Sequence, residues 1–433
     1  MKKNIVYLTL SAEIIHHGHI NIINKASKIG KLTIGLLTDK AIAEKKQLPL
    51  LNWQQRKSIL ENITGVKKII PQYKWDDSIN ILKYKPQFVI HGDDWIKGDR
   101  HLRTRVKKAL KSYGGKLVEI PFTKNISSTS IRSKVLELGS NSASKRNMLE
   151  RLISSKKLVR IIEAHSPLSA IIAEKISFDT KTEKKEFDGF WSSSLTDSTL
   201  KGKPDIEVLE TAQRLANINE IFDVTSKPLI LDADTGGKLE HFEINIKSIE
   251  RSGVSAVIIE DKKGLKKNSL FGTSVKQEQE DIKTFCNKIK LGNKSIANKE
   301  LMIFARIESF ILGKGLNDAL KRANSYIDAG AKGIMIHSKL NKPTEVFKFA
   351  EKFRKTNNKT PLIVVPSSFS AVRENELINH GFNIVIYANH LLRASYPAML
   401  NTARMILKNG RAKEAEKKLM KIKEILELIP GTK

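Results

Sequence analysis

PLILDADTGG, residues 228–237, is the stretch from which the fold of this chain can be worked out. Four apolar residues lead into two aspartates separated by one alanine, a pattern typical of a buried parallel strand with polar groups at its carboxyl end. Alternate side chains of an extended chain share a face, so Asp232 and Asp234 should leave the strand on the same side. The pair is either two surface aspartates at a turn or part of a cation site, and the surrounding strand ends decide between these.

Seven further apolar runs follow the same pattern, and amphipathic segments separate them. The eight strands are expected at 159–164, 187–194, 228–234, 256–261, 301–309, 332–338, 361–368 and 382–389. Helices between them are expected at 205–219, 241–252, 314–329 and 344–355. Eight strand–helix units within about 250 residues predict a (β/α)8 TIM-type barrel.

Chemically active side chains follow nearly every one of these strands. Barrels of this kind carry their active sites at the carboxyl ends of the strands, so these groups should form a cup suited to a metal and an anionic substrate. They are Glu163 and His165, Ser192 to Ser194, Asp232 and Asp234, Glu260 and Asp261, Arg306 and Glu308, His337 and Ser338, Ser367 and Ser368, and Asn389 and His390. The presence of these polar residues at the neighbouring strand ends favours the cation site as the role of Asp232 and Asp234.

The first 140 residues form a separate strand–helix pattern. Strands are expected at 4–10, 32–38, 67–72, 88–93 and 116–121, and helices include 20–30, 53–63 and 101–112. This alternation predicts a doubly wound, Rossmann-like α/β domain. Residues 139–147, GSNSASKRN, contain no periodic apolar residue, so we place a linker at 141–150 and the second domain at 151–433.

Three histidines lie within four residues at the end of the first strand, in the sequence HHGH of residues 16–19. Open α/β sheets bind ligands at this edge. Zinc is one candidate, but the neighbouring residues supply no third ligand beyond Glu13. Phosphate fits better, because Gly18 allows close approach to the backbone and imidazoles at a helix start can donate hydrogen bonds.

Charge and composition point to anionic partners. The chain has 76 Lys and Arg against 46 Asp and Glu, a net charge of +30, which suits nucleotides and phosphorylated metabolites. Aromatic residues make up only 6%, so nucleic acid is a minor alternative. The single cysteine, Cys286, excludes an intramolecular disulfide and a cysteine-based zinc cluster. We find no membrane-length apolar run and no signal peptide, and therefore expect a cytoplasmic protein with no membrane partner.

HHGH, together with HGDDW (91–95) and ISSTSIR (126–132), resembles the HxGH nucleotidyltransferases, in particular cytidylyltransferases of the glycerol-3-phosphate and choline-phosphate type. The resemblance implies that His16 and His19 stabilise charge on the α-phosphate as pyrophosphate leaves, with Mg²⁺ or another divalent cation accompanying CTP. It implies nucleotide binding by His16, Gly18, His19, Lys46, Asp94, Ser128, Thr129 and Arg132. Lys45 and the weaker candidate Arg56 are further expected phosphate clamps.

One departure from that family lies in front of the histidines. Many members approach them through GxFDxxH, whereas this chain has LSAEIIH at 10–16. The usual acceptor alcohol phosphates are therefore less expected, and the domain looks more like the branch fused to phosphonate-making enzymes. A non-catalytic binding module is the alternative for this domain.

The second domain resembles the phosphoenolpyruvate mutase/isocitrate lyase superfamily. The stretches that carry the resemblance stand in the family order: EAHSPLSA, WSSSL, LDADTG, EDKKGLKKNS, ARIESF, IHSK and YANHLLRAS. Lyase members place a cysteine after the fourth strand, in K(K/R)CGH. This chain instead has Lys262, Lys266, Asn268 and Ser269, the KxNS form of phosphoenolpyruvate mutases and phosphonopyruvate hydrolases.

The same resemblance implies a role for each residue of the cup. Asp232 would bind magnesium directly, and Asp205, Asp234 and Glu260 would hold its water ligands. Loop 261–274 would close over the substrate. The substrate itself would meet Trp191, the amides around Ser193, Ser194 and Leu195, and Ser269, while the catalytic groups would be Asp205, Lys266, Asn268, Arg306 and His337.

The implied reaction converts phosphoenolpyruvate into phosphonopyruvate, and the first domain would transfer CMP from CTP to a phosphonate such as 2-hydroxyethylphosphonate. The alternative is a phosphonopyruvate hydrolase-like barrel behind a non-catalytic nucleotide-binding domain. The Lys- and Glu-rich segment 391–428 is expected to be helical. In the family, terminal helices pack on a neighbouring subunit and imply a homo-oligomer, although a solvated helix fits the pattern equally.

Overall fold

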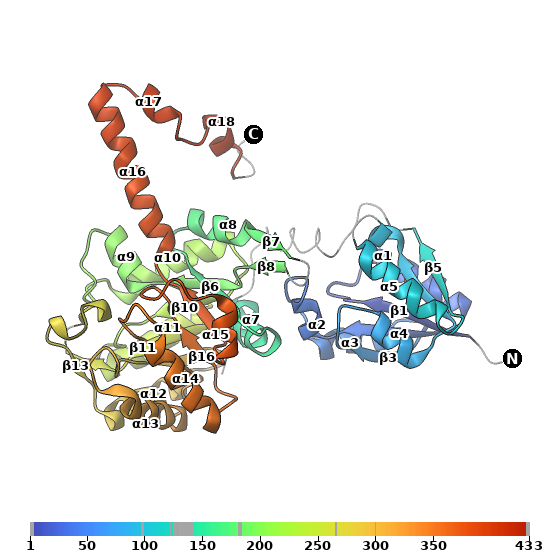
Figure 1. Cartoon of the computed structure of the whole chain (residues 1–433), viewed down its shortest axis with the longest axis horizontal. Helices are drawn as coiled ribbons and strands as arrows, with labels where there is room; N and C mark the ends of the chain where they lie inside the picture. The colour runs from blue at the N-terminus through green and yellow to red at the C-terminus, as the bar shows by residue number, and fades with distance from the viewer. Residues whose placement is uncertain are drawn as a thin grey trace.

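The computed structural model shows two lobes, a smaller α/β domain and a barrel (Figure 1). It describes residues 4–96, 99–121, 123, 128, 142–180, 184–264, 266–298 and 300–429, without the side chains of Asp94 and residues 142–144. None of the helices in these ranges is long and apolar enough to cross a membrane.

The smaller domain is a five-stranded parallel sheet with the order β3-β2-β1-β4-β5. Its strands are β1 Ile5–Leu10, β2 Lys31–Leu37, β3 Val66–Gln72, β4 Phe88–Gly92 and β5 Lys116–Ile120. Its helices are α1 His17–Ile29, α2 Asp39–Ala43, α3 Trp53–Glu61, α4 Ser78–Tyr84 and α5 Arg100–Lys111, with the 3-10 turn η1 at Asp93–Ile96. All five predicted strands are confirmed. The strand order reverses between β1 and β4, so HHGH after β1 lies where such sheets bind ligands.

The second domain is a closed barrel of eight strands, every one parallel to its neighbours. The strands are β6 Val159–Glu163, β9 Gly189–Ser192, β10 Leu229–Asp232, β11 Ala256–Glu260, β14 Met302–Ile307, β15 Gly333–Ile336, β16 Leu362–Val364 and β17 Ile384–Tyr387. Each lies within a predicted run, which confirms the TIM-type barrel. Alternate strand residues face inward and outward, so one apolar cluster fills the barrel and a second lies beneath the helices.

Among the described residues, eight helices lie between these strands: α8 Pro167–Lys175, α9 Ser194–Leu200, α10 Thr211–Val224, α11 Leu239–Arg251, α12 Ile282–Ser295, α13 Gly315–Asp328, α14 Thr344–Thr356 and α15 Glu374–Asn379. Two short hairpins are added. One pairs β7 Ser177–Asp179 with β8 Lys184–Glu186. The other pairs β12 Lys262–Lys263 with β13 Glu278–Gln279, and between these strands lies the 3-10 segment η2, Ser269–Ser274.

The helix predicted at 205–219 was wrong at its start, because α10 begins only at Thr211. Glu207 takes a φ of +60°, a conformation that no right-handed helix contains, so Asp205 lies in a loop rather than in a helix.

The segment expected to be a linker at 141–150 is largely helical, since α7 runs from Ser142 to Ser155. Lys145 Nζ donates to the carbonyl of Phe222 at 2.8 Å, and Arg146 Nε lies 2.9 Å from Glu300 Oε2. These buried charged side chains anchor α7 to the barrel, and a search for apolar periodicity does not detect them.

The C-terminal segment is helical, as predicted, but broken into α16 His390–Asn409, α17 Lys413–Glu416 and α18 Ile422–Leu426. Helix α16 leaves the barrel and projects away from it (Figure 1).

Candidate active sites

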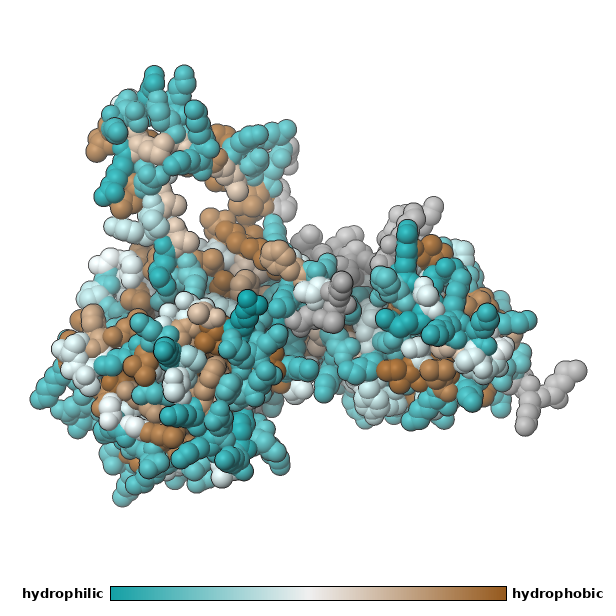
Figure 2. Space-filling model, in the orientation of Figure 1, coloured by the Kyte–Doolittle hydropathy of each residue, from teal (hydrophilic) through white to brown (hydrophobic). Residues whose placement is uncertain are grey.

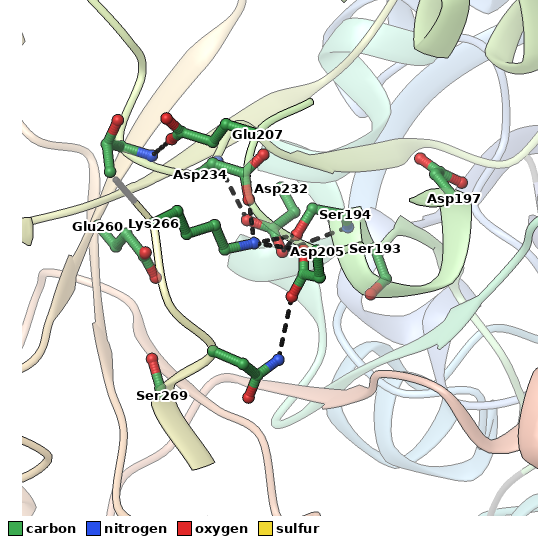
Figure 3. Close-up of polar contacts among 12 residues, drawn as sticks. Ser193, Ser194, Asp197, Asp205, Glu207, Asp232, Asp234, Glu260, Lys266 and Ser269 are labelled. Atoms are coloured by element: carbon green, nitrogen blue, oxygen red, sulfur yellow. Dashed lines mark hydrogen bonds and ion pairs between the residues drawn. The ribbon is translucent and has the colours of Figure 1, made fainter. Parts of the chain in front are cut away.

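Asp232 of PLILDADTGG ends β10 at the mouth of the barrel, and Asp234 follows two residues later. Asp232 Oδ2 accepts a hydrogen bond from Ser194 Oγ at 3.0 Å, and Asp232 Oδ1 accepts one from the Asp234 amide at 3.2 Å. Asp234 takes a φ of +53°, and the hydrogen bond from its amide to Asp232 helps to hold that unusual backbone conformation. Both side chains are nearly buried, and they lie beside Ser194, Asp205 and Lys266 (Figure 3).

Lys266 reaches from the loop after β11 into this group of carboxylates. Its Nζ donates to Asp205 Oδ1 at 2.7 Å, to Ser194 Oγ at 2.6 Å and to Asp234 Oδ1. Burial opposes the charge, but the carboxylates around it hold the Lys266 pKa above its usual range. Asn268 Nδ2 donates to Asp205 Oδ2 at 3.0 Å. The loop is therefore fastened over the carboxylates by two residues of its KxNS sequence.

The carboxylates differ in how readily they ionise. Burial, reinforced by the charge of Asp232, raises the pKa of Asp234 to about 6. Burial and the neighbouring Glu308 raise the pKa of Glu260 to about 7. Asp232 is equally buried, yet Lys266 and Arg306 lower its pKa. Of these three carboxylates, Asp232 is the one whose pKa is lowered, and a direct cation ligand must carry its charge.

Oxygen donors gather around Asp232 at the mouth of the barrel. Among the described residues, no three Asp, Glu, His or Cys side chains converge closely enough to hold an ion by themselves. The gathered donors are nevertheless carboxylate and hydroxyl oxygens, which hard cations prefer. Magnesium keeps several waters and takes one or two carboxylates directly, so this set fits a site with a single direct ligand and water-mediated partners.

Two cations, Arg306 and Lys262, lie among the carboxylates of Glu260 and Glu308. Arg306 at the end of β14 donates from Nε to Glu308 Oε1 at 2.6 Å and from Nη2 to Ser269 Oγ at 2.6 Å. Lys262 Nζ lies 3.1 Å from Glu260 Oε1. Burial and the Arg306 charge lower the pKa of His337 to about 3, so this imidazole is neutral at physiological pH. An anionic group would find a fixed positive charge and a neutral imidazole here.

Three predicted substrate-binding residues, Trp191, Ser193 and Leu195, are described by other contacts than those with the carboxylates. Trp191 is 2% exposed and belongs to the apolar cluster inside the barrel. Ser193 is the N-cap of α9, where its Oγ accepts from the Thr196 amide at 3.4 Å, and Leu195 lies in the first turn of that helix.

Arg214 on α10 is a structural part of the site that the sequence did not point to. Its Nη1 donates to the carbonyl of Asp232, Nη2 to the carbonyl of Ser192 at 3.0 Å, and Nε to Asp197 Oδ2 at 3.0 Å. Arg214 therefore links the carboxyl ends of β9 and β10 to helix α10. Arg214 lies inside a helix and not after a strand, so a search of strand ends misses it.

The smaller domain has a pocket of about 730 Å³ at the switch point of its sheet. Its lining includes five of the predicted nucleotide-binding residues: His16, Gly18, His19, Lys46 and Ser128. A Cβ added at Gly18 would lie 3.0 Å from the His16 ring, so the glycine permits this close approach. Thr129, Arg132 and the side chain of Asp94 lie outside the described residues.

The histidines of the pocket hold each other in place. The His16 amide donates to His19 Nδ1 at 3.4 Å, which leaves the proton of neutral His19 on Nε2. Burial, with His16 and Lys46 nearby, lowers the pKa of His19 to about 4. His19 is therefore a neutral hydrogen-bond donor at physiological pH.

Arg56 does not serve as a phosphate clamp, contrary to prediction. Its side chain is fully buried, and its guanidinium donates to Asp39 Oδ1 at 2.7 Å and to the carbonyls of Ser11, Leu37 and Leu51. These acceptors use the guanidinium, so Arg56 holds backbone segments together instead of facing a ligand.

The family model described as phosphoenolpyruvate phosphomutase matches residues 149–407, more than half of the chain. The chain belongs to the phosphoenolpyruvate phosphomutase family. A cytidylyltransferase-like family model matches residues 11–134, so the phosphomutase domain follows a cytidylyltransferase-like domain.

Phosphomutase relatives align with the barrel domain. The phosphoenolpyruvate phosphomutase of Tetrahymena pyriformis is 36% identical over 289 residues, which cover 66% of this chain and 92% of that protein. A crystal structure of phosphoenolpyruvate phosphomutase from Streptomyces platensis subsp. rosaceus has a TM-score of 0.60 at 32% identity, covering 67% of this chain and 95% of the other. A phosphonopyruvate hydrolase in complex with oxalate and Mg²⁺ has a TM-score of 0.58 at 30% identity, covering 66% and 94%.

Lyase-type chemistry in this phosphomutase family member would need a cysteine in the loop after β11. Cys286 instead lies on α12, where its Sγ contacts the carbonyl of Ser325 at 3.4 Å. Cys286 therefore does not supply a thiol to the mouth of the barrel.

Proposed function

We propose that the barrel interconverts phosphoenolpyruvate and phosphonopyruvate with magnesium, and that the first domain transfers CMP from CTP to a small phosphonate such as 2-hydroxyethylphosphonate. The observation that carries the first part is the closed loop, with Lys266 and Asn268 bound to the carboxylates at the strand ends. Support for magnesium comes from the oxygen donors around Asp232 and from the hydrolase structure that contains Mg²⁺ and oxalate.

Asp232 would hold the magnesium directly, and Asp205, Asp234 and Glu260 would act through its waters. When bound, the ion would stabilise negative charge on the enolate oxygen of pyruvate. The amides of Ser194 and Leu195 lie in the first turn of α9 and would bind the substrate carboxylate.

The phosphoryl group would move between the enolate oxygen and the methylene carbon, so the P–O bond breaks and the C–P bond forms within one closed site. Arg306 supplies the fixed charge for its oxygens. Neutral His337 and Asn268 supply hydrogen bonds without a proton transfer. The closed loop excludes water, which would otherwise capture the phosphoryl group and give hydrolysis.

Phosphorus NMR of the full chain, incubated with phosphonopyruvate and Mg²⁺, tests the barrel. Formation of phosphoenolpyruvate is expected, with loss of conversion in EDTA and recovery when Mg²⁺ is restored. Release of inorganic phosphate without phosphoenolpyruvate would instead establish the hydrolase, which the 30% identical hydrolase structure makes the specific rival.

For the first domain, the supporting observation is the pocket shared by His16, Gly18, His19, Lys46 and Ser128. His16 and His19 would stabilise the α-phosphate charge as pyrophosphate leaves, and Lys46 would meet the triphosphate. Pyrophosphate release from CTP with a panel of phosphonates tests this, with His19→Ala as the inactive control. Binding of CTP without pyrophosphate from any acceptor would favour a non-catalytic nucleotide-binding module.

The C-terminal helices support a homo-oligomer. No residue of α16 is buried within the chain, and the helix carries apolar side chains into solvent, including Tyr396, Met399 and Leu407. Hydrophobic surface, coloured brown, is visible on the projecting C-terminal part (Figure 2). A second copy of the chain would cover them.

A further inference from the structure

The loop between α2 and α3, residues 44–52, faces two parts of the molecule at once. On one side Lys46 and Pro49 line the nucleotide pocket. On the other side Leu48 is 2% exposed and packs into the apolar cluster that fills the barrel, beside Met148, Leu149 and Leu152 of α7. One short loop therefore carries both pocket-lining residues and a residue of the barrel's apolar cluster, so its seat on α7 fixes where Lys46 lies.

Arg151 of α7 adds polar contacts to the same loop. Its Nη1 donates to the carbonyl of Leu50 at 3.0 Å, and its Nη2 lies 3.0 Å from Asp39 Oδ2 at the start of α2. The Arg151 and Asp39 side chains are only 19% and 18% exposed, so solvent screens this ion pair less than it would an exposed pair.

The contact continues through Asp39 into the pocket wall. The second carboxylate oxygen of Asp39 accepts from Arg56 Nη2 at 2.7 Å. Arg56 in turn donates to the carbonyls of Leu51, in the loop, and of Ser11, just ahead of the HHGH residues. Arg151, Asp39 and Arg56 therefore tie the barrel helix to two of the backbone segments that carry nucleotide-pocket residues.

We propose that α7 of the barrel domain positions the nucleotide pocket, with Arg151 as a positioning residue for Lys46. The proposal rests on the cytidylyl transfer proposed above. It makes the barrel a structural part of the transferase site, although the two sites share no substrate. Arg151 contacts neither His16 nor His19, so its effect should fall on nucleotide binding and on the order of the loop.

The test compares Arg151→Met in the full chain with Glu150→Gln, an exposed neighbour on the same helix, and with Arg151→Lys. Losing a partly buried ion pair should raise the KM for CTP about fivefold and leave kcat within about twofold. Hydrogen exchange of the amides in 44–52 should become faster in Arg151→Met, while mutase turnover should stay unchanged. Arg151→Lys keeps the positive charge but loses the paired donors of the guanidinium. Its KM for CTP and its rate of hydrogen exchange should therefore lie between those of wild type and Arg151→Met.

Each remaining result separates the two proposals. If wild type binds CTP but releases no pyrophosphate, cytidylyl transfer fails, and loop exchange together with the CTP Kd still tests the positioning role. Unchanged exchange in 44–52 with unchanged CTP binding overturns that role. A parallel loss of both enzyme activities would report general destabilisation and would also overturn it.

Discussion

Lys266 is the cation that holds the carboxylates of Asp205 and Asp234 together. Lys266→Met removes that charge at a buried position and loosens the loop that excludes water. We expect mutase turnover to fall by at least about 100-fold, a typical cost of removing one charge-stabilising group. Phosphorus NMR of phosphoenolpyruvate formation measures the loss. Lys267→Met is the matched control, and a similar loss in that variant would show that the loop responds to any lost lysine.

Glu119 on β5 provides a pH-dependent contribution to the first domain. Arg103 donates to it twice at 2.8 Å and Trp95 Nε1 once at 2.7 Å, and the Arg103 guanidinium is the main reason that its pKa falls to about 2. The unfolded chain binds the proton near the ordinary value of 4.5. The stabilisation is therefore complete above about pH 4.5 and is lost as the pH falls toward 2.

Glu119→Gln should accordingly lower the free energy of unfolding of this domain by about 1 kcal/mol at pH 7, since the pair is partly solvent-screened. The difference between variant and wild type should shrink below pH 4.5. Denaturant-dependent hydrogen exchange of the β5 amides measures it. Glu61→Gln, which breaks the exposed Lys57–Glu61 pair, should change little at either pH. A Glu119→Gln effect that is equal at pH 3 and pH 7 would contradict the assignment.

At the scale of elements, η2 in the loop over the barrel depends on one glycine. Gly272 has φ +54° and ψ −131°, a conformation that essentially only glycine adopts, and an added Cβ would meet the side chain of Lys339. Gly272→Ala should disfavour the closed loop by about 1–3 kcal/mol and lower mutase kcat about tenfold or more, with barrel stability unchanged. Steady-state kinetics and thermal unfolding check this. Thr273→Ala, at an exposed neighbouring position, is the control that should retain full turnover.

The strands were predictable because each is an apolar run with a polar end, and all thirteen predicted strands formed. The residues that hold the strand ends of the site in place could not be predicted from the sequence. Arg214 reaches the ends of β9 and β10 from a helix, and Arg56 turns away from the pocket to bind carbonyls. The apolar periodicity of the sequence predicts neither of these contacts, because both depend on acceptors that are distant along the chain. The start of α7 was missed for the same reason, because Lys145 and Arg146 are held by distant acceptors.

At the scale of the whole molecule, the C-terminal helices are fixed at one end and uncovered at the other. Glu163 at the end of β6 accepts from the amides of Leu391 and Leu392, which anchors the start of α16 to the barrel. Beyond that anchor Met399 is 60% and Leu407 86% exposed. Burying such a side chain contributes about 1.5–3 kcal/mol, so a partner surface should cover this helix.

We therefore expect the full chain to form a homo-oligomer through α16, measured by light scattering and analytical ultracentrifugation. Met399→Asp combined with Leu407→Asp places charges in the apolar contact and should shift the chain toward monomer while circular dichroism stays unchanged. Asn401→Asp adds a charge to an exposed position of the same helix without removing apolar surface, and it should leave the assembly intact. A wild-type chain that is monomeric at micromolar concentration would contradict the oligomer and would leave the projecting helix solvated.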